Sequence, residues 1–250
     1  MFTEKVKPET SPADAAPSVP RKRGRPPGVT EQGQDARQRL YRTAIDLIRR
    51  RGYEATTMRD VAKAAGVSAG LLYRYFPSKR AVVLELYETL SDEYAGRAAA
   101  MRAGKWRDRF LFALETSLDV LAPHRNTLRA LTSTLIGDES EGVFAPGATP
   151  CRIRVERVFH LAVAEASDAP HASVVAPLGR ILYLAHMAVI LWWLLDRSPK
   201  QRATTALLAL MRGAIPSFAL ALRLGPTRSL VRSFDALFRE ALFDDWKEEG

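Results

Sequence analysis

The feature that most constrains this chain is a pair of short helical segments joined by a three-residue turn, lying between Thr57 and Phe76. Thr57 and Ser68 each stand where the N-cap of a helix is expected. Asp60, three residues after Thr57, makes a near-match to a capping box, with aspartate in the place of the usual glutamate. Gly66 supplies a residue that tolerates a positive φ at the turn. Two short helices held by such a turn are typical of a helix-turn-helix, whose second helix enters the major groove of DNA.

Helical periodicity continues on both sides of this motif. A helix that begins near Asp35 and ends at Gly52 precedes it, and a helix capped by Ser78 follows it. Polar loops are expected at 137–150 and 167–175, and no segment has the alternation of a strand. The sequence therefore predicts an all-α fold. The later helices are expected near 105–122, 126–136, 151–166, 176–195, 200–223 and 228–247.

Charge is divided unevenly along the chain. Residues 1–80 contain 17 Lys and Arg against 8 Asp and Glu, whereas residues 81–250 contain 20 of each kind. A basic module joined to a neutral one is typical of a protein that binds a polyanion, although an anionic membrane would attract the same charge. We expect a flexible basic arm over 1–34, a helix-turn-helix domain over 35–95 and a second helical domain over 96–250.

Several classes of protein are disfavoured. Cys151 is the only cysteine, so no intramolecular disulfide can form, which fits a reducing cytoplasm. The N-terminus lacks the apolar region of a signal peptide, and the longest apolar run, Ile181–Leu195, is shorter than the about 20 residues that a membrane span needs. Glu156 and His160 are spaced like a surface pair rather than a metal site. We therefore expect a cytoplasmic protein with no membrane partner, no metal, no cofactor and no catalytic set.

The stretch TTMRDVAKAAGVSAGLLYRYFPSKRAVV resembles the N-terminal domain of the TetR family of bacterial transcriptional regulators. The shared pattern is a Thr before the second helix, then Ala-x-x-Ala-Gly-Val-Ser-x-Gly-x-Leu-Tyr-x-Tyr-Phe-x-Ser-Lys. It extends over about residues 35–95, and the remainder is similar only in being helical and of suitable length. The resemblance implies a DNA-reading domain followed by a domain that dimerises and holds a small molecule.

The same resemblance implies a set of DNA contacts. Arg59 would meet DNA from the first helix of the motif, and Lys79 would contact a phosphate. Because residues 69–71 (Ala-Gly-Leu) have no side-chain hydrogen-bonding groups, base reading depends on Arg74, Arg59 and apolar contacts. Arg74 is the main candidate for reading a guanine, and a contact with phosphate alone is an equal alternative. The expected DNA-binding residues are Arg23, Arg25, Thr57, Arg59, Ser68, Ala69, Gly70, Leu71, Tyr73, Arg74, Tyr75 and Lys79.

The basic arm contains PRKRGRPP at 20–27, which resembles an AT-hook. In such a segment an extended Arg-Gly-Arg core lies in a narrow minor groove, where arginines favour the negative potential. We expect Arg23 and Arg25 to extend the footprint into A·T-rich flanks. The alternative is a generic basic tail that adds only counterion release.

Two apolar segments predict the dimer. Leu178–Leu195 and Ala203–Leu224 are apolar round much of their circumference, which favours a four-helix arrangement with a second subunit over a thick monomeric core. Pro216 is expected to kink or interrupt the second segment.

A ligand pocket is predicted on the first of these segments. Tyr183 and His186 share a helix face, with Trp192 and Trp193 further along, and together they would line a largely apolar cavity. Ordinary core packing explains the same residues and is the favoured alternative.

The function that fits best is a sequence-specific transcriptional regulator, a ligand-responsive repressor that binds a palindromic operator as a homodimer. Its partners would be double-stranded DNA, a second copy of the chain and a largely apolar effector. An architectural protein that uses the hook and helix-turn-helix without an effector is the alternative, and a helical enzyme with an incidental basic N-terminus is a third. The regulator is favoured because residues 105–250 are neutral and rich in apolar helices, which an architectural protein would not need.

Overall fold

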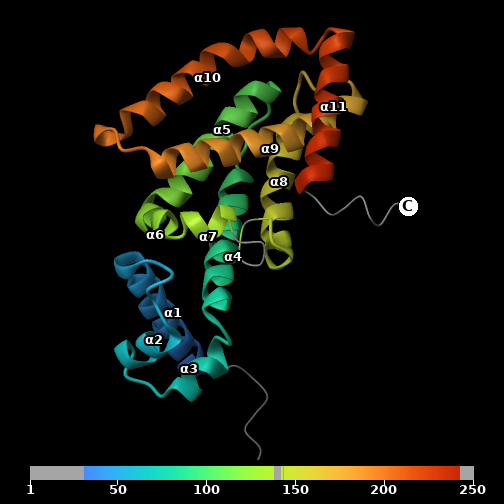
Figure 1. Ribbon diagram of the computed structural model, residues 1–250. Helices are drawn as coiled ribbons and strands as arrows, with labels where there is room; N and C mark the ends of the chain where they lie inside the picture. Colours follow the sequence, from blue (N-terminus) through green and yellow to red (C-terminus); the bar gives the residue numbers. More distant parts are fainter. Residues whose placement is uncertain (1–30, 138–141, 143, 243–250) are drawn as a thin grey trace, which may run out of the picture.

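The computed structural model describes residues 31–137, 142 and 144–242. Within these ranges the chain forms helices joined by turns and loops, with no strand, which confirms the all-α prediction (Figure 1). The α-helices are α1 (Glu31–Arg51), α2 (Met58–Ala64), α3 (Ala69–Tyr75), α4 (Lys79–Ala98), α5 (Trp106–Leu121), α6 (Arg125–Ala130), α7 (Thr132–Gly137), α8 (Thr149–Ala164), α9 (Ala172–Leu195), α10 (Arg202–Ala221) and α11 (Gly225–Leu242). Short 3-10 helices lie at η1 (Ala122–His124), η2 (Pro146–Ala148) and η3 (Pro199–Gln201).

Helices α1, α2 and α3 and the start of α4 form a small unit with its own core. The apolar stripe of α1 supplies Leu40 and Ala44, while Leu72 and Phe76 enter from the second half of the motif. All four are at most 1% exposed. A few buried side chains thus fix the angles between short helices that would be marginal alone.

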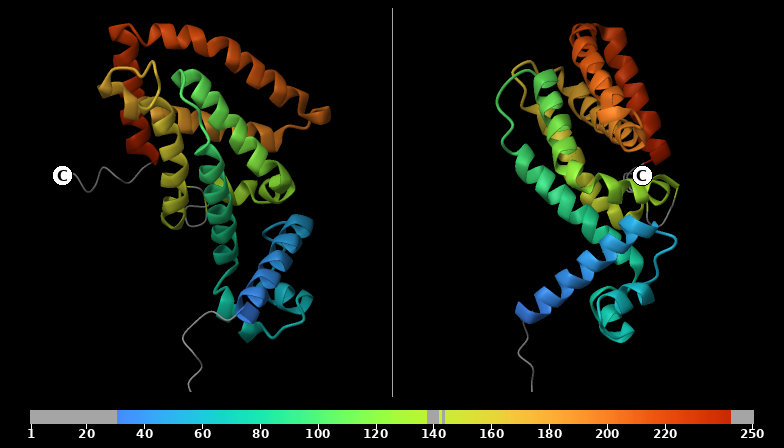
Figure 2. Two further views of the ribbon diagram at one scale, coloured as in Figure 1. Left: turned by 180° about the vertical axis from the view of Figure 1, so that it is seen from behind. Right: turned by 90° about the vertical axis from the view of Figure 1, so that its left-hand side faces the viewer.

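Helix α4 connects this small unit to the larger bundle (Figures 1 and 2). Its first turn is capped by Ser78, whose Oγ accepts from the Ala81 N–H at 3.1 Å. Val82 lies in the core of the small unit, whereas Leu90 and Tyr94 lie in the core of the bundle. One uninterrupted helix therefore takes part in both cores.

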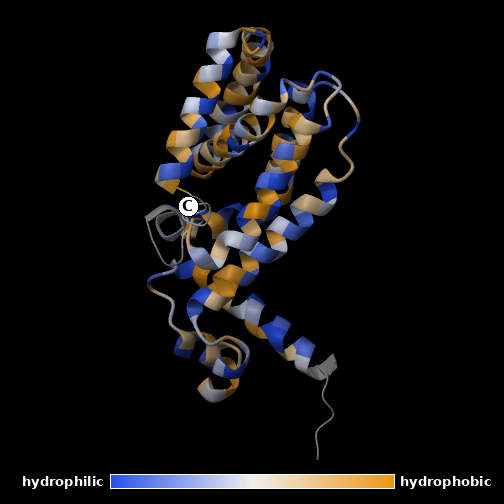
Figure 3. Cartoon of the chain, turned by 90° about the vertical axis from the view of Figure 1, so that its right-hand side faces the viewer, coloured by the Kyte–Doolittle hydropathy of each residue, from blue (hydrophilic) through white to orange (hydrophobic). Residues whose placement is uncertain are grey.

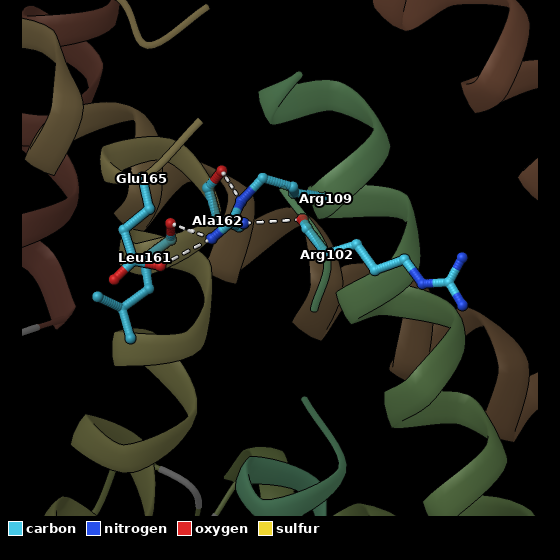
Figure 4. A network of polar contacts seen from close by, with 5 residues as sticks. All are labelled: Arg102, Arg109, Leu161, Ala162 and Glu165. Atoms are coloured by element: carbon cyan, nitrogen blue, oxygen red, sulfur yellow. Dashed lines mark hydrogen bonds and ion pairs between the residues drawn. The ribbon is translucent and has the colours of Figure 1, made fainter. Parts of the chain in front are cut away.

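The bundle is built round α9, which packs against α8 and α11. Gly179 allows a close approach to α8, because a Cβ at this position would lie 2.9 Å from the His160 Cα. Arg109 ties α5 to the end of α8 (Figure 4). Its guanidinium donates to the carbonyls of Leu161, Ala162 and Arg102 at 2.9–3.1 Å and pairs with Glu165. The buried charge is thus satisfied by several acceptors, as burial requires.

Helices α1 and α9 each begin four residues earlier than expected, at Glu31 and Ala172, so the predicted arm and the predicted loop 167–175 are each shorter than expected. Two other helices differ in their continuity. The helix expected at 126–136 is divided into α6 and α7 at Leu131, which is fully buried and has φ −100° and ψ 1°. In contrast, α10 continues through Pro216 and curves over the bundle without a break (Figure 1). Arg212 and Pro216 are both exposed, so water can take the hydrogen bond that a proline removes from the helix.

Helix α10 buries little of its apolar surface. Among the described residues, α9 and the segment Pro199–Ala221 are the two stretches long and apolar enough to cross a membrane, by length and composition alone. The apolar window of α9 is 39% buried inside the bundle, whereas that of Pro199–Ala221 is 6% buried. In Figure 3 apolar residues recur along this end of the bundle, where α10 and α11 lie. The large exposed apolar residues here include Leu210, Phe218, Leu220, Leu224, Leu230, Phe234 and Leu237.

Candidate nucleic-acid interface and ligand cavity

The first helix of the motif begins with a complete capping box. Thr57 Oγ1 accepts from the Asp60 N–H at 3.2 Å, and the Thr57 N–H donates to Asp60 Oδ2 at 3.0 Å. The Thr57 hydroxyl also donates to that carboxylate at 2.6 Å. These hydrogen bonds from Thr57 lower the pKa of Asp60. The expected box with aspartate in the third position is therefore confirmed.

The turn between the two helices has the backbone that the sequence predicts. Gly66 has φ +66°, a conformation that costs little only for glycine. The Val67 N–H donates to the Ala62 carbonyl at 3.0 Å, and the Val67 side chain packs against the small core. Ser68 Oγ then accepts from the Leu71 N–H at 3.2 Å and starts α3. The direction of α3 is thus fixed by local hydrogen bonds and one apolar contact.

Helix α3 presents most of its surface to solvent. Leu72 is fully buried and holds the helix on the small unit, while Tyr75 is half-buried against it. Tyr73 is 48% exposed, and Gly70 has no atom within 4 Å of the position of a Cβ. The start of this helix can therefore approach a groove closely. The exposed predicted residues on this face are Ser68, Ala69, Gly70, Leu71, Tyr73 and Arg74.

The other predicted DNA contacts lie beside this face or outside it. Arg59 is exposed on α2, whereas the Thr57 hydroxyl is already engaged in the capping box. Lys79 Nζ donates to the Tyr53 carbonyl at 2.6 Å and lies 3.8 Å from the centre of the Tyr53 ring. Lys79 must therefore share or exchange this partner to reach a phosphate. Arg23 and Arg25 lie outside the described residues.

The bundle contains a cavity of about 320 Å³ that is partly open to the surface and lies between α4, α5, α6, α8 and α9. Tyr183 and His186 lie in its wall, as the sequence predicts, but Trp192 and Trp193 do not. Trp192 is 49% exposed, and the Trp193 indole N–H donates to Gln201 Oε1 at 2.7 Å on the other side of α9. The wall also contains Tyr94, Ser117 and Arg152, which come from three other helices and which sequence reasoning missed. No periodic signal links residues so far apart in the chain.

The polar groups of the cavity wall are deeply buried. His186 Nε2 lies 2.7 Å from Ser117 Oγ, and burial lowers the pKa of His186 to about 3. Burial also raises the pKa of Tyr94, whose ring stacks on that of His186 with centroids 6.0 Å apart. Arg152 Nη1 lies 3.6 Å from Glu156 Oε2, four residues further along α8. At neutral pH the imidazole and phenol are therefore uncharged, and the guanidinium has a carboxylate beside it.

A metal centre is not formed by the part of the chain that the structure describes. No group of three or more His, Cys, Asp and Glu side chains there is arranged to hold a metal ion.

Comparison of the sequence with known proteins gives matches to the helix-turn-helix region. Residues 40–86 match the family model described as bacterial regulatory proteins, tetR family. The HTH-type transcriptional repressor KstR2 of Rhodococcus jostii (strain RHA1) is 38% identical over 73 residues, which are 29% of this chain and 36% of that protein. The match thus spans about a third of the length of such curated relatives.

Solved structures extend the similarity of fold to 72–80% of the chain. A tetR-family transcriptional regulator from Streptomyces coelicolor is 25% identical, with a TM-score of 0.55 over 80% of this chain and 88% of that one. A TetR regulator from Nitrosomonas europaea ATCC 19718 is 20% identical, with a TM-score of 0.52 over 72% of this chain and 97% of that one. Residues 40–86 are therefore a helix-turn-helix domain of the tetR-family type, within a chain that has the all-helical fold of solved tetR-family regulators.

Proposed function

We propose that this protein is a sequence-specific transcriptional regulator, a ligand-responsive repressor that binds a palindromic operator as a homodimer. The observation that carries the proposal is the exposed face of α3, held by caps and by Leu72 on a basic N-terminal unit. A short helix with free N–H groups at its start can contact phosphates while its side chains reach base edges in the major groove. Arg74 and Arg59 are the residues on this surface best suited to reading bases.

The dimer is proposed to form through α10 and the exposed side of α11. Helix α9, the other segment expected from the sequence, packs inside the bundle against α8 and α11. Leu210 and Leu220 are 71% and 64% exposed on α10, and Leu230 is 56% exposed on α11. Apolar patches of this kind mark interaction sites on soluble proteins. A second copy of the chain would cover them in the same way on both subunits, because a two-fold interface is self-complementary.

The proposed effector site is the cavity in the bundle. Leu90 and Tyr94 of α4 lie in its wall, and the same helix carries Lys79 and Arg80 at the edge of the reading unit. Helix α1 also contacts α6. A ligand that prefers one arrangement of these helices would change the separation of the two α3 helices from about 34 Å, one turn of DNA. An architectural protein without an effector remains the alternative.

For the arm we propose that Arg23 and Arg25 enter the minor groove beside the operator. Deletion of residues 1–30 should weaken binding to operators with A·T flanks more than to operators with G·C flanks. Equal weakening on both would leave the arm as a basic tail that acts through counterion release alone.

Selection of bound sites from random DNA with the purified full-length protein tests the main proposal. We expect an inverted repeat with half-sites spaced by one or more helical turns. Protection of DNA without sequence preference would favour the architectural alternative, and absence of DNA binding at moderate salt would contradict both.

A further inference from the structure

We infer that the cavity takes an uncharged, mostly apolar molecule with a single hydrogen-bond acceptor oxygen, such as a small ketone or alcohol, and that this oxygen lies at Tyr94 and His186. The inference rests on the proposed effector site and gives it a ligand class. It depends on the size of the cavity, the charge of its wall and two buried polar atoms.

The size of the cavity limits the ligand. Its volume of about 320 Å³ lies at the lower end of the range of small-molecule sites, roughly 300–1,000 Å³, so a compact ligand is expected. Apolar side chains from several helices form most of the wall, including Leu90, Leu121, Leu128 and Ile190. Burial of a compact apolar body is therefore the main source of affinity.

The charge of the wall excludes an ionised ligand. The residues that line the cavity include no Asp or Glu, so an ammonium group would find no counter-charge there. The one cation in the wall is Arg152, whose side chain is 6% exposed, and Glu156 already lies beside it at 3.6 Å. A carboxylate would compete with Glu156 for this guanidinium and would lose its own hydration. Burying an ion without a dedicated partner costs far more than burying a neutral group.

Two buried polar atoms provide the hydrogen-bonding end. Tyr94 Oη and His186 Nδ1 are each almost fully buried and have no hydrogen-bond partner among the described residues. When the Ser117 hydroxyl donates to His186 Nε2, the imidazole proton lies on Nδ1, and this atom is a donor. Tyr94 Oη is a second donor, and the two rings stack on each other. An acceptor oxygen of the ligand that reaches these donors would compensate for their desolvation.

A matched set of eight-carbon probes tests the ligand class. Binding of 2-octanone, 1-octanol, octanoate and octylamine to the full-length protein is measured by calorimetry at pH 7, without DNA. We expect the two neutral probes to bind at least about tenfold more tightly than the two ionised ones, because only the ionised probes bury a charge. Tighter binding of octanoate or octylamine, or no binding of any probe, would overturn the inference.

Two substitutions locate the site. Tyr94→Phe keeps the ring and removes one donor, so the affinity for 2-octanone should fall about fivefold, in proportion to one neutral hydrogen bond. Cys151→Phe fills space in the wall and should abolish binding of both neutral probes, whereas Cys151→Ala should retain it. Thermal melting verifies that each variant folds. If Cys151→Phe does not fold, Tyr94→Phe still tests the site. Unchanged affinity in Tyr94→Phe would contradict the placement of the oxygen.

The DNA-binding measurement is independent of these probes. Failure to bind any selected operator would refute the regulator while leaving the ligand chemistry open to the same calorimetry. Operator binding together with preferred binding of an ionised probe would refute only the ligand class.

Discussion

His186 is an imidazole kept neutral inside an apolar bundle, and its titration links pH to stability. Burial lowers its pKa from the ordinary value of 6.5 to about 3 in the folded protein. As the pH falls, the unfolded chain therefore takes up a proton on this histidine before the folded protein does. The free energy of unfolding is therefore unaffected by this titration above pH 6.5. Between pH 6.5 and 3 it falls by about 1.4 kcal/mol per pH unit.

Urea unfolding at pH 7.5 and 5.5 measures this effect. We expect the free energy of unfolding to fall by about 1.4 kcal/mol more in the natural protein than in His186→Gln, which has no titrating group at this position. Identical pH dependence in the two proteins would show that folding does not lower the pKa of His186.

Arg74 is the residue on which base reading is predicted to depend. If it contacts a guanine, Arg74→Ala should weaken operator binding by about 1–3 kcal/mol and relax the preference at one base pair. Arg97→Ala, in the last turn of α4 and far along the chain from α3, is the control and should have little effect. Uniform weakening across all sequences, with a smaller salt slope, would instead assign Arg74 to a phosphate.

At the scale of elements, the contact between α8 and α9 depends on a missing side chain. Gly179→Ala places a Cβ 2.9 Å from the His160 backbone, so the two helices must separate. We expect a loss of about 1–3 kcal/mol in unfolding free energy, as for other overpacked cores. Gly96→Ala, in the last turn of α4, is the matched control: no atom lies within 4 Å of the position of a Cβ, so the unfolding free energy should not fall. Thermal or urea unfolding of both variants measures the contrast.

The elements that could be predicted from the sequence are those set by local chemistry. The caps at Thr57, Ser68 and Ser78 and the positive φ of Gly66 each act within three or four residues, so a short window of sequence contains the whole signal. The same locality explains why the exposed face of α3 could be anticipated residue by residue.

What could not be predicted depends on contacts between distant helices. The division at Leu131 places that side chain in the bundle core, which periodicity along one helix does not reveal. The cavity brings Tyr94, Ser117 and Arg152 together with His186 across segments up to 92 residues apart in the chain. Trp192 follows Leu191, which lines the cavity, and the rotation of about 100° per residue along a helix turns Trp192 away from the wall.

At the scale of the whole molecule, the proposed dimer predicts a change of assembly. Leu210→Lys combined with Leu220→Lys places charges on the exposed side of α10 and should convert a dimer to a monomer, because unpaired lysines are costly to bury. Light scattering after gel filtration measures the mass. Ile153→Lys on α8, where the residue is 54% exposed, is the control and should leave the mass unchanged. A double variant that stays dimeric would place the interface elsewhere.

The continuity of α4 has a mechanical consequence. Tyr94 lies fifteen residues after Lys79, so about 22 Å of continuous helix joins the cavity wall to the helix-turn-helix unit. A small tilt of α4 near Tyr94 would therefore move the end near Lys79, and α3 beside it, by a larger distance. In the proposed dimer the two-fold axis would make α4 of the partner subunit move in the same way, so the separation of the two α3 helices would change by twice the displacement of either one.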